Sequence, residues 1–197
     1  MWTLFVMLFA ARPAEPRACP ATVSALPVPP ALADERLRGA STLVVSKAAR
    51  RIARYADGSL VGCWTIGLAM SADGDAWSGT KTRRGDRKTP EGWYRTSDKP
   101  WSSFYGAIAL HYPERRDADA GLAAGRIDAS THARIVEALE ARRKPPQDTP
   151  LGGEILIHGG GGDSDWTLGC VALDDDDLDR LRATLPKSMR TDVLVLP

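Results

Sequence analysis

Two stretches in the C-terminal third decide the fold, Gly153-Glu154-Ile155-Leu156-Ile157-His158-Gly159 and Asp165-Trp166-Thr167-Leu168-Gly169-Cys170-Val171-Ala172-Leu173. One apolar run ends at His158, and a second begins at Cys170, twelve positions later. That separation is a loop's length, so we expect two strand ends to lie side by side. A thiol beside an imidazole is the minimum equipment for nucleophilic acyl transfer, because the thiolate attacks and a nearby base raises its population. The sequence therefore predicts a cysteine acyltransferase or hydrolase.

The rest of the chain is dominated by strand patterns. Residues 41–47 and 51–56 are short apolar runs, and Asp57-Gly58 predicts a tight turn into residues 59–70, so these segments indicate a β-meander. A polar loop punctuated by glycine and proline leads into a strand near Tyr94, and residues 104–112 and 191–196 are further strand candidates. We expect a mainly β domain of the α+β class.

Two helices are expected near the C-terminal half of this domain. Ser130 or Thr131 can cap a helix that the Pro145-Pro146 pair ends. A second helix follows the acidic run 174–177, where carboxylates favour a helix N-terminus, and its leucines recur at helical spacing. We interpret that acidic run as helix-start charge and not as a metal site, because it lacks the alternating ligand spacing of a calcium loop.

Length and charge bound the class of protein. A chain of 197 residues suits one domain of ordinary size. The formal net charge of +1 provides no field that would select nucleic acid or an anionic membrane surface. The sequence predicts no cofactor and no metal site, because no nucleotide-binding loop and no paired zinc ligands are present. Nothing in it indicates an oligomeric state.

The N-terminus predicts export. Residues 2–11 are apolar apart from Thr3 and are followed by Arg12-Pro13, a run too short for the roughly 18 to 20 residues of a spanning helix. We interpret residues 1–18 as a signal peptide or short anchor, which places the protein in the periplasm or cell envelope. Residues 19–40 are rich in proline and alanine and predict a flexible linker. The folded domain is expected over residues 41–197.

The three cysteines cannot all pair with one another. If two pair, Cys19 with Cys63 is the arrangement that leaves Cys170 free. The alternative for Cys63 is a buried thiol that behaves as a small hydrophobic side chain. If Cys170 is catalytic, its thiol should react well below the pH of about 8.5 at which an unperturbed cysteine titrates.

The motifs, taken in order, resemble the L,D-transpeptidase (YkuD-type) catalytic domain of bacterial cell-wall enzymes. The resemblance spans roughly residues 41–197 and is closest to a branch with an Asp-Trp-Thr-x-Gly-Cys motif. It rests on Gly85-Asp86-Arg87-Lys88-Thr89-Pro90-Glu91-Gly92, on Ile157-His158-Gly159, and on Thr167-Leu168-Gly169-Cys170-Val171-Ala172-Leu173. It implies a twisted β-sandwich or barrel with two or three peripheral helices.

The resemblance also implies a reaction and roles for residues. Cys170 would be acylated by a peptidoglycan stem tetrapeptide, with His158 as base and later acid and the backbone N–H of Gly169 as an oxyanion donor. The acyl group would pass to an amine. Gly159, Trp166, Thr167 and Arg87 are the candidates for binding substrate.

Two positions depart from the usual family pattern, which has histidine and arginine where this chain has Leu168 and Ala172. An arginine in place of Ala172 would suit a substrate carboxylate, so its absence leaves the substrate and the acceptor open. A cation of the turn loop (Arg83, Arg84, Arg87 or Lys88) could serve instead. A carboxypeptidase or amidase of the same fold and a non-catalytic wall-binding module are the alternatives. We interpret Asp86 as a turn-forming residue and His111 and His132 as structural.

Overall fold

The fold is seen in a computed structural model that describes residues 18–70 and 78–197. Nearly all of the expected signal peptide or anchor lies outside the described residues. The strands are β1 (Thr42–Ser46), β2 (Arg51–Ala56), β3 (Ser59–Thr65), β4 (Gly92–Asp98), β5 (Ile108–Leu110), β6 (Leu156–His158), β7 (Val171–Ala172) and β8 (Asp192–Leu196). The α-helices are α1 (Arg115–Ala123), α2 (Ala129–Glu140) and α3 (Asp175–Ala183), and three short 3-10 turns precede β1: η1 (Val23–Ala25), η2 (Pro30–Leu32) and η3 (Glu35–Arg38).

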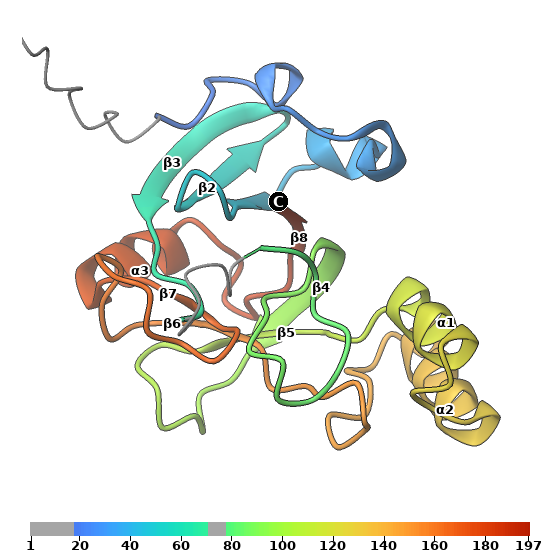
Figure 1. Cartoon of the computed structure of the whole chain (residues 1–197). Coiled ribbons are helices and arrows are strands. Elements are labelled where there is room, and N and C mark those ends of the chain that lie inside the picture. Colours follow the sequence, from blue (N-terminus) through green and yellow to red (C-terminus); the bar gives the residue numbers. More distant parts are fainter. Residues whose placement is uncertain (1–17, 71–77) are drawn as a thin grey trace, which may run out of the picture.

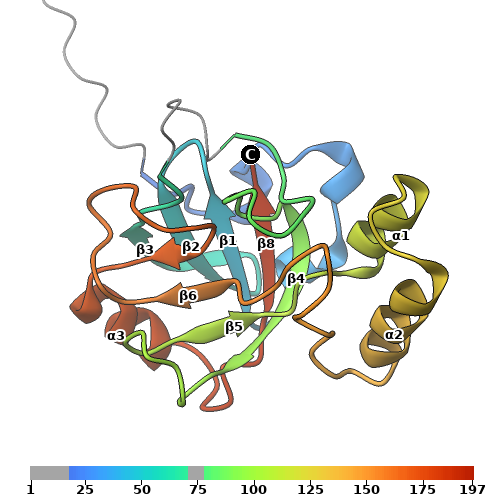
Figure 2. The same ribbon diagram turned by 60° about the horizontal axis from the view of Figure 1, so that its bottom comes forward.

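The strands form one curled mixed sheet in the order β3-β2-β1-β8-β4-β5-β6-β7. β1 with β8 and β6 with β7 are parallel, and the other neighbours are antiparallel. The sheet curls so that β5 and β6 come round toward β1 and β8, as comparison of Figures 1 and 2 shows, while α3 and the α1–α2 pair lie at opposite sides. This half-barrel with three peripheral helices confirms the predicted fold class.

The two faces of the sheet have different surroundings. The concave face carries the main apolar core, in which Leu43, Val195, Tyr94 and Ile157 are almost fully buried and contact leucines of α3. Because side chains alternate along a strand, the intervening residues point to the convex face. There Val44 and Leu194 belong to a second apolar cluster, whereas the β5–β7 part carries a small cluster of Ala107, Ala109 and Leu156 against which Cys170 packs.

Residues 18–40 cover the convex face of β1, β2 and β8. Val23 and Leu37 are buried against Val44 and Leu194, and Trp93 Nε1 donates to the Leu32 carbonyl at 2.8 Å. The expectation of a flexible linker is wrong for this part of the chain. Its prolines fall between short 3-10 turns whose leucines and valine bury apolar surface, and composition alone does not distinguish that use of proline from an extended tether.

A disulfide bond fastens the same segment to the sheet. Cys19 and Cys63 are bonded, which leaves Cys170 as the free cysteine of the chain. Of the two possibilities for Cys63, the paired one is therefore present. The bond joins the start of the covering segment to edge strand β3, so the segment is held at this end by a covalent bond.

Some helix and strand limits differ from the sequence-based expectation. Helix α1 was not predicted, because its apolar content is low; it begins at a capping box formed by Glu114 and Asp117. Helix α2 is capped by Asp128 and not by Ser130 or Thr131. The strands expected over 59–70 and 104–112 are shorter in the structure, where only β3 and β5 are regular strands. Residues 66–70 instead form main-chain hydrogen bonds with the segment around Cys170, residues 166–172.

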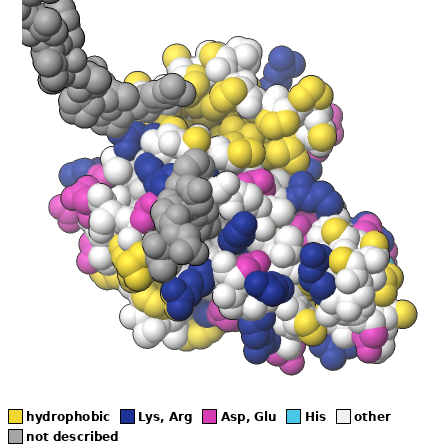
Figure 3. Space-filling model, viewed as in Figure 1, with side chains coloured by type: hydrophobic (Ala, Val, Ile, Leu, Met, Phe, Trp, Pro, Cys, Tyr) yellow, Lys and Arg dark blue, Asp and Glu magenta, His cyan; other side chains and the backbone are white. Residues whose placement is uncertain are grey.

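Within the two described ranges no helix has the length and apolarity needed to cross a membrane. The surface in Figure 3 is divided: hydrophobic side chains gather in the upper part, where Figure 1 shows the N-terminal segment, and Lys and Arg side chains are spread over the middle and lower parts.

Candidate active site

Cys170 and His158 lie on the same face of neighbouring strands. β6 and β7 pair in parallel, with Ile157 opposite Val171 and His158 opposite Ala172. Cys170 immediately precedes β7, and its Sγ accepts a hydrogen bond from the Leu156 N–H at 3.4 Å. Because alternate residues of a strand share a face, Cys170 and His158 both point to the convex side. The two apolar runs therefore lie side by side, but because they are parallel Cys170 is level with Leu156, two residues along β6 from His158.

The hydrogen bond of His158 defines its tautomer. Nδ1 lies 2.6 Å from the Gly159 carbonyl oxygen. A carbonyl can only accept, so Nδ1 carries the hydrogen, and in the neutral ring Nε2 carries the lone pair. Burial lowers the pKa of His158 below its ordinary value, and the bond to Gly159 opposes that shift only in part. At neutral pH the ring is thus an uncharged base.

Two aromatic side chains hold the imidazole in place. The Phe104 ring is stacked on it, with centroids 4.4 Å apart and planes 29° apart. Trp166 meets it edge-on at 5.5 Å, and the Trp166 Nε1–H donates to the Gly161 carbonyl at 2.9 Å. His158 is only 1% exposed as a result. The sequence pattern did not indicate Phe104, because it lies in the β4–β5 loop, far from either motif.

The thiol of Cys170 is held by two main-chain groups. Its Sγ lies 3.7 Å from the Glu154 carbonyl oxygen, toward which the S–H is directed. Burial raises the pKa of Cys170, and the Leu156 N–H only partly opposes this shift. In this geometry burial therefore disfavours the thiolate, and reactivity of Cys170 well below pH about 8.5 stays a prediction. The resting pair is a neutral thiol and a neutral imidazole.

Glu154 was not identified from the sequence, although it lies beside the thiol. Its backbone is in the left-handed region, with φ of 57°, and its N–H donates to Gln147 Oε1 at 2.8 Å. Its carboxylate forms ion pairs with Lys99 and with Lys144, the latter at 3.4 Å. These contacts fix the carbonyl that receives the thiol hydrogen. A motif search could not find this residue, since its main-chain atom makes the contact.

The loop before Cys170 is held by side-chain hydrogen bonds. Asp165 forms an ion pair with Arg50 at 2.6 Å and accepts from the Leu68 N–H at 2.8 Å. The Thr167 hydroxyl donates to the Cys170 carbonyl at 2.8 Å and accepts from the Gly169 N–H at 3.3 Å. In this resting state the Gly169 N–H, a candidate oxyanion donor, is therefore directed at Thr167.

The glycines beside the reactive residues make room for the protein's own atoms. A Cβ on Gly159 would lie 2.1 Å from an Asp175 carboxylate oxygen, and one on Gly169, where φ is 120°, would lie 2.8 Å from the Lys88 carbonyl. These contacts require glycine for close packing of the chain. Gly159 does not line the cavity that contains Cys170, so its candidate substrate contact has no structural support.

Cys170 and His158 open into one cavity of about 1100 Å³. Of the substrate-binding candidates, Arg87, Trp166 and Thr167 line it, together with Arg84 and the 66% exposed Leu168. Among the described residues, neither Arg84 nor Arg87 forms an ion pair with a carboxylate. The cavity therefore has an apolar wall next to the thiol and two arginines available to an anionic group.

A buried ion pair shapes the turn that presents Arg87. Lys81 Nζ lies 2.9 Å from Asp86 Oδ1, and both side chains are almost fully buried. Asp86 also accepts hydrogen bonds from the Thr82 and Lys88 N–H groups, at 2.7 and 3.2 Å. These contacts agree with the interpretation of Asp86 as a turn-forming residue, and they leave Arg87 in the left-handed region, with φ of 57°.

The other two histidines lie away from this cavity. His111 Nε2 is 2.9 Å from Ser97 Oγ, and burial, with help from nearby cations, lowers the pKa of His111 to about 4. His132 is paired with Asp119 at the α1–α2 pair. Among residues 18–70 and 78–197, no group of three or more potential ligands is arranged to hold a metal ion.

Comparisons of the sequence and the fold find related proteins. The family model of the L,D-transpeptidase catalytic domain (YkuD) matches residues 40–195. Among solved structures, the helical cell shape determining protein Pgp2 from Campylobacter jejuni is 22% identical, with a TM-score of 0.50, and the match covers 79% of this chain and 47% of that one. A mutant of the same protein gives a TM-score of 0.51 at 22% identity, with 79% and 46% covered.

An L,D-transpeptidase from Mycobacterium smegmatis is 13% identical with a TM-score of 0.42, over 80% of this chain and 59% of that one. The chain spans about half the length of the Pgp2 structures that it matches. No curated protein matches the sequence.

Proposed function

The chain belongs to the L,D-transpeptidase catalytic domain family, and from this premise we propose that it is a peptidoglycan L,D-transpeptidase with Cys170 as nucleophile and His158 as base. The observation that carries the proposal is the bond from His158 Nδ1 to the Gly159 carbonyl. It leaves the lone pair on Nε2, within the same cavity as the thiol. A structural histidine would not need an unprotonated nitrogen in a cavity shared with a free cysteine.

In the proposed reaction the thiol turns from Glu154 toward His158. Nε2 accepts the thiol proton as Sγ attacks the carbonyl carbon that precedes the terminal D-alanine of the stem tetrapeptide. The tetrahedral intermediate then collapses, the C–N bond breaks, and the imidazolium returns the proton to the leaving D-alanine nitrogen. The acyl group remains on Cys170 as a thioester.

The second half repeats these steps with an acceptor. An amine of another stem attacks the thioester, His158 accepts its proton, and the C–S bond breaks as the thiolate regains a proton. The backbone N–H groups of Cys170 and Gly169 are the proposed oxyanion donors. The Gly169 N–H must first leave Thr167, so that donor becomes available only when substrate displaces a weak bond of 3.3 Å.

Arg87 is proposed to bind a substrate carboxylate in place of the arginine that the family usually has two residues after the cysteine. Ala172 at that position is fully buried on the same sheet face as His158 and Cys170, so the cavity must use other cations. Arg87 and Arg84 line the cavity without carboxylate partners among the described residues. Arg87→Gln should raise KM for stem peptides by about tenfold, since a charge-assisted hydrogen bond is lost. Arg83→Gln, in the same turn but outside the cavity lining, is the matched control.

Export to the periplasm or cell envelope is part of the proposal. The Cys19–Cys63 disulfide supports it, because disulfides persist in oxidising compartments and are rare in the cytosol. A role in cell shape belongs to the same proposal, since the structurally similar Pgp2 is a helical cell shape determining protein.

A hydrolytic role is the second candidate function. Carboxypeptidase or amidase activity would use the same thioester with water as acceptor, and the fully buried Ala172 in place of an arginine favours it, because the usual cation for an acceptor or substrate carboxylate is missing. A non-catalytic wall-binding module is the alternative from another class.

One experiment separates the three functions. Purified protein is incubated with defined tetrapeptide muropeptides and the products are identified by mass spectrometry. Transpeptidation gives a thioester adduct and cross-linked dimers; hydrolysis gives the adduct and trimmed peptides. Binding without an adduct, equal in the wild type and Cys170→Ala, would replace the enzymatic proposal with the binding module. An adduct that persists in Cys170→Ala would overturn the assignment of the nucleophile.

A further inference from the structure

The convex sheet face that carries Cys170 continues as far as β4. Ser97 of β4 is opposite Ala109 of β5, and Ala109 is opposite Leu156 of β6, which contacts Cys170. Arg95, two residues before Ser97, points to the same face. Three strand spacings separate β4 from β7, so Arg95 lies about 15 Å from the thiol along one surface.

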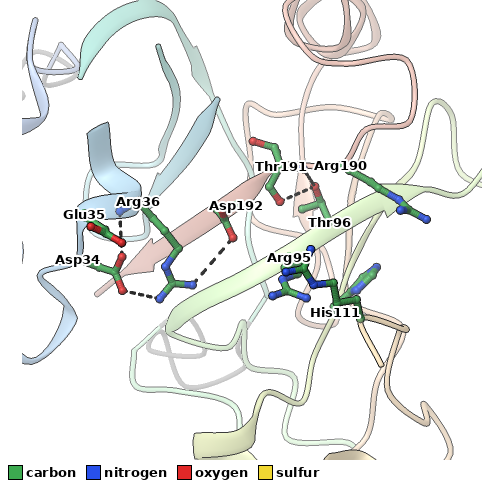
Figure 4. Close-up of a pocket in the computed structure, with 10 residues that line it drawn as sticks. Asp34, Glu35, Arg36, Arg95, Thr96, His111, Arg190, Thr191 and Asp192 are labelled. Atoms are coloured by element: carbon green, nitrogen blue, oxygen red, sulfur yellow. Dashed lines mark hydrogen bonds and ion pairs between the residues drawn. The ribbon is translucent and has the colours of Figure 1, made fainter. Parts of the chain in front are cut away.

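A second cavity lies at this far end, between the 3-10 turn η3 and the C-terminus of α2. Its volume is about 630 Å³. The residues that line it are Asp34, Glu35, Arg36, Arg95, Thr96, His111, Arg142, Arg190, Thr191 and Asp192. Most of these are shown in Figure 4, in which Arg36 lies between Asp34 and Asp192 while Arg95 lies beside His111.

The charges of this cavity divide into a paired end and an unpaired end. Arg36 is 2.7 Å from Asp34 and 3.9 Å from Asp192, so one arginine is shared by two carboxylates. Arg95, Arg142 and Arg190 form no ion pair with any described carboxylate. Asp192 is opposite Arg95 in the β4–β8 register but is directed to Arg36. Four arginines and three carboxylates thus line one cavity, and three of the guanidinium groups form no ion pair with a described residue.

His111 lines the same cavity as these cations. Lys144, Arg95 and Arg190 all act to lower the pKa of His111 by their positive charge, after the larger effect of burial. Lys144 in turn pairs with Glu154 at 3.4 Å, beside Cys170. Lys144 therefore links the cations of this cavity to Glu154, which lines the cavity that contains Cys170. His111 stays neutral at physiological pH and adds no charge of its own.

The backbone at Arg142 is unusual for an arginine. Helices α1 and α2 both end in a left-handed residue, which is Gly125 with φ of 65° after α1 and Arg142 with φ of 54° after α2. Glycine is the residue that this position ordinarily favours. At the end of α2 the chain instead has a guanidinium that lines the cavity. The chain therefore keeps a cation at the cavity in a position where glycine would suit the backbone better.

We propose that Arg95, Arg142 and Arg190 form a second binding site, which takes a multiply charged oxyanion. Guanidinium groups bind carboxylate and phosphate oxygens with paired hydrogen bonds, and three of them match a ligand with two or more negative charges. The site follows from charge and geometry alone. Only its natural ligand, the carboxylates of a peptidoglycan stem peptide that also reaches toward Cys170, rests on the proposed function.

Calorimetric titration of the purified protein with citrate and with inorganic phosphate, at constant ionic strength, tests the site. We expect saturable binding that weakens about tenfold or more in Arg95→Gln/Arg142→Gln/Arg190→Gln, since charge-assisted hydrogen bonds are lost. Arg38→Gln removes an exposed arginine outside the cavity and should bind as the wild type does. Absence of saturable binding, or equal weakening in Arg38→Gln and the triple variant, overturns the proposal.

Two further measurements keep the result interpretable. Arg142→Gly relieves the left-handed backbone, so it should keep or raise the melting temperature while weakening citrate binding; unchanged binding contradicts a ligand role for Arg142. Muropeptides with free carboxylates should compete with citrate, whereas amidated ones should not. Phosphate binding without such competition would assign the site to a free anion and remove the stem-peptide assignment.

The proposal and the catalytic function fail separately. Formation of the Cys170 adduct in the triple variant, together with loss of citrate binding, supports the second site as distinct from the nucleophile. Normal adduct formation without any citrate binding in the wild type refutes the second site alone. Citrate binding without an adduct in the wild type refutes the catalytic proposal alone.

Discussion

The convex face of the sheet has two halves that the chain treats differently. Over β1, β2 and β8 it presents Val44 and Leu194, and residues 18–40 cover it with apolar side chains and a disulfide. Over β5 to β7 it presents Ala109, Leu156 and Cys170, and only loops lie above it. The strands differ too, with five to seven residues in β1–β3 and two or three in β5–β7.

The difference shows how one sheet supports both stability and a reactive site. Long paired strands with both faces buried supply apolar burial, which is the dominant favourable contribution to folding. Short strands with alanines on one face leave a shallow floor from which a thiol and an imidazole project. We therefore expect changes in the covered half to alter stability with little effect on chemistry, and changes in the open half to have the opposite effect.

The largest expected effect is in the open half. Cys170→Ala should abolish thioester formation, and His158→Gln should lower kcat by about 10² to 10⁴, because the proton acceptor is lost. The melting temperature of Cys170→Ala should stay close to that of the wild type. Mass spectrometry of the adduct and a thermal melt check both statements. Marked unfolding of Cys170→Ala would show that the open half also carries stability.

The next effect tests the boundary between chemistry and stability. Lys81→Met leaves Asp86 as an unpaired buried carboxylate, so the free energy of unfolding should fall by about 3 to 5 kcal/mol. Urea titration followed by circular dichroism measures it. Lys88→Met, in the same turn and without an ion pair among the described residues, should change it by no more than about 0.5 kcal/mol. A similar loss in both variants would assign the effect to the turn and not to the pair.

The covered half should show a stability effect without a catalytic one. Cys19→Ser/Cys63→Ser removes a bond across a sequence separation of 44 residues, which should cost about 2 to 4 kcal/mol in the free energy of unfolding. The adduct rate on Cys170, measured well below the new melting temperature, should be unchanged. A slower rate in the folded double variant would mean that the N-terminal segment positions the site.

The smallest expected effect concerns pH. The neutral form of His158 is the base, and burial lowers its pKa below 6.5, so kcat/KM should stay constant as pH falls from 7 and decline only below 6.5. Phe104→Ala uncovers the ring, which should raise that pKa and move the acid decline to higher pH by up to about one unit. The pH profile of both proteins measures the shift. If the acid decline does not move, burial by Phe104 is not what lowers the pKa of His158.

Sequence patterns located the reactive pair but not its surroundings. His158 and Cys170 could be predicted because one ends an apolar run and the other begins the next, and these two runs are neighbouring strands. Glu154 and Phe104 could not, since one acts through its carbonyl and the other reaches the imidazole from a loop of another strand pair. The covering role of residues 18–40 was missed because proline-rich composition is shared by tethers and by packed 3-10 turns.

The parallel pairing of β6 with β7 has a consequence for how this site can vary. Main-chain hydrogen bonds between adjacent strands set the spacing of the thiol and the imidazole, so the connecting residues 159–169 do not determine it. Within that connection, Trp166 and Thr167 are fixed by their contacts and the Ser164 carbonyl packs against Gly67, whereas Asp163 is exposed. Insertions or deletions there should be tolerated, and the rim of the cavity could be remodelled for a new substrate without moving the reacting atoms.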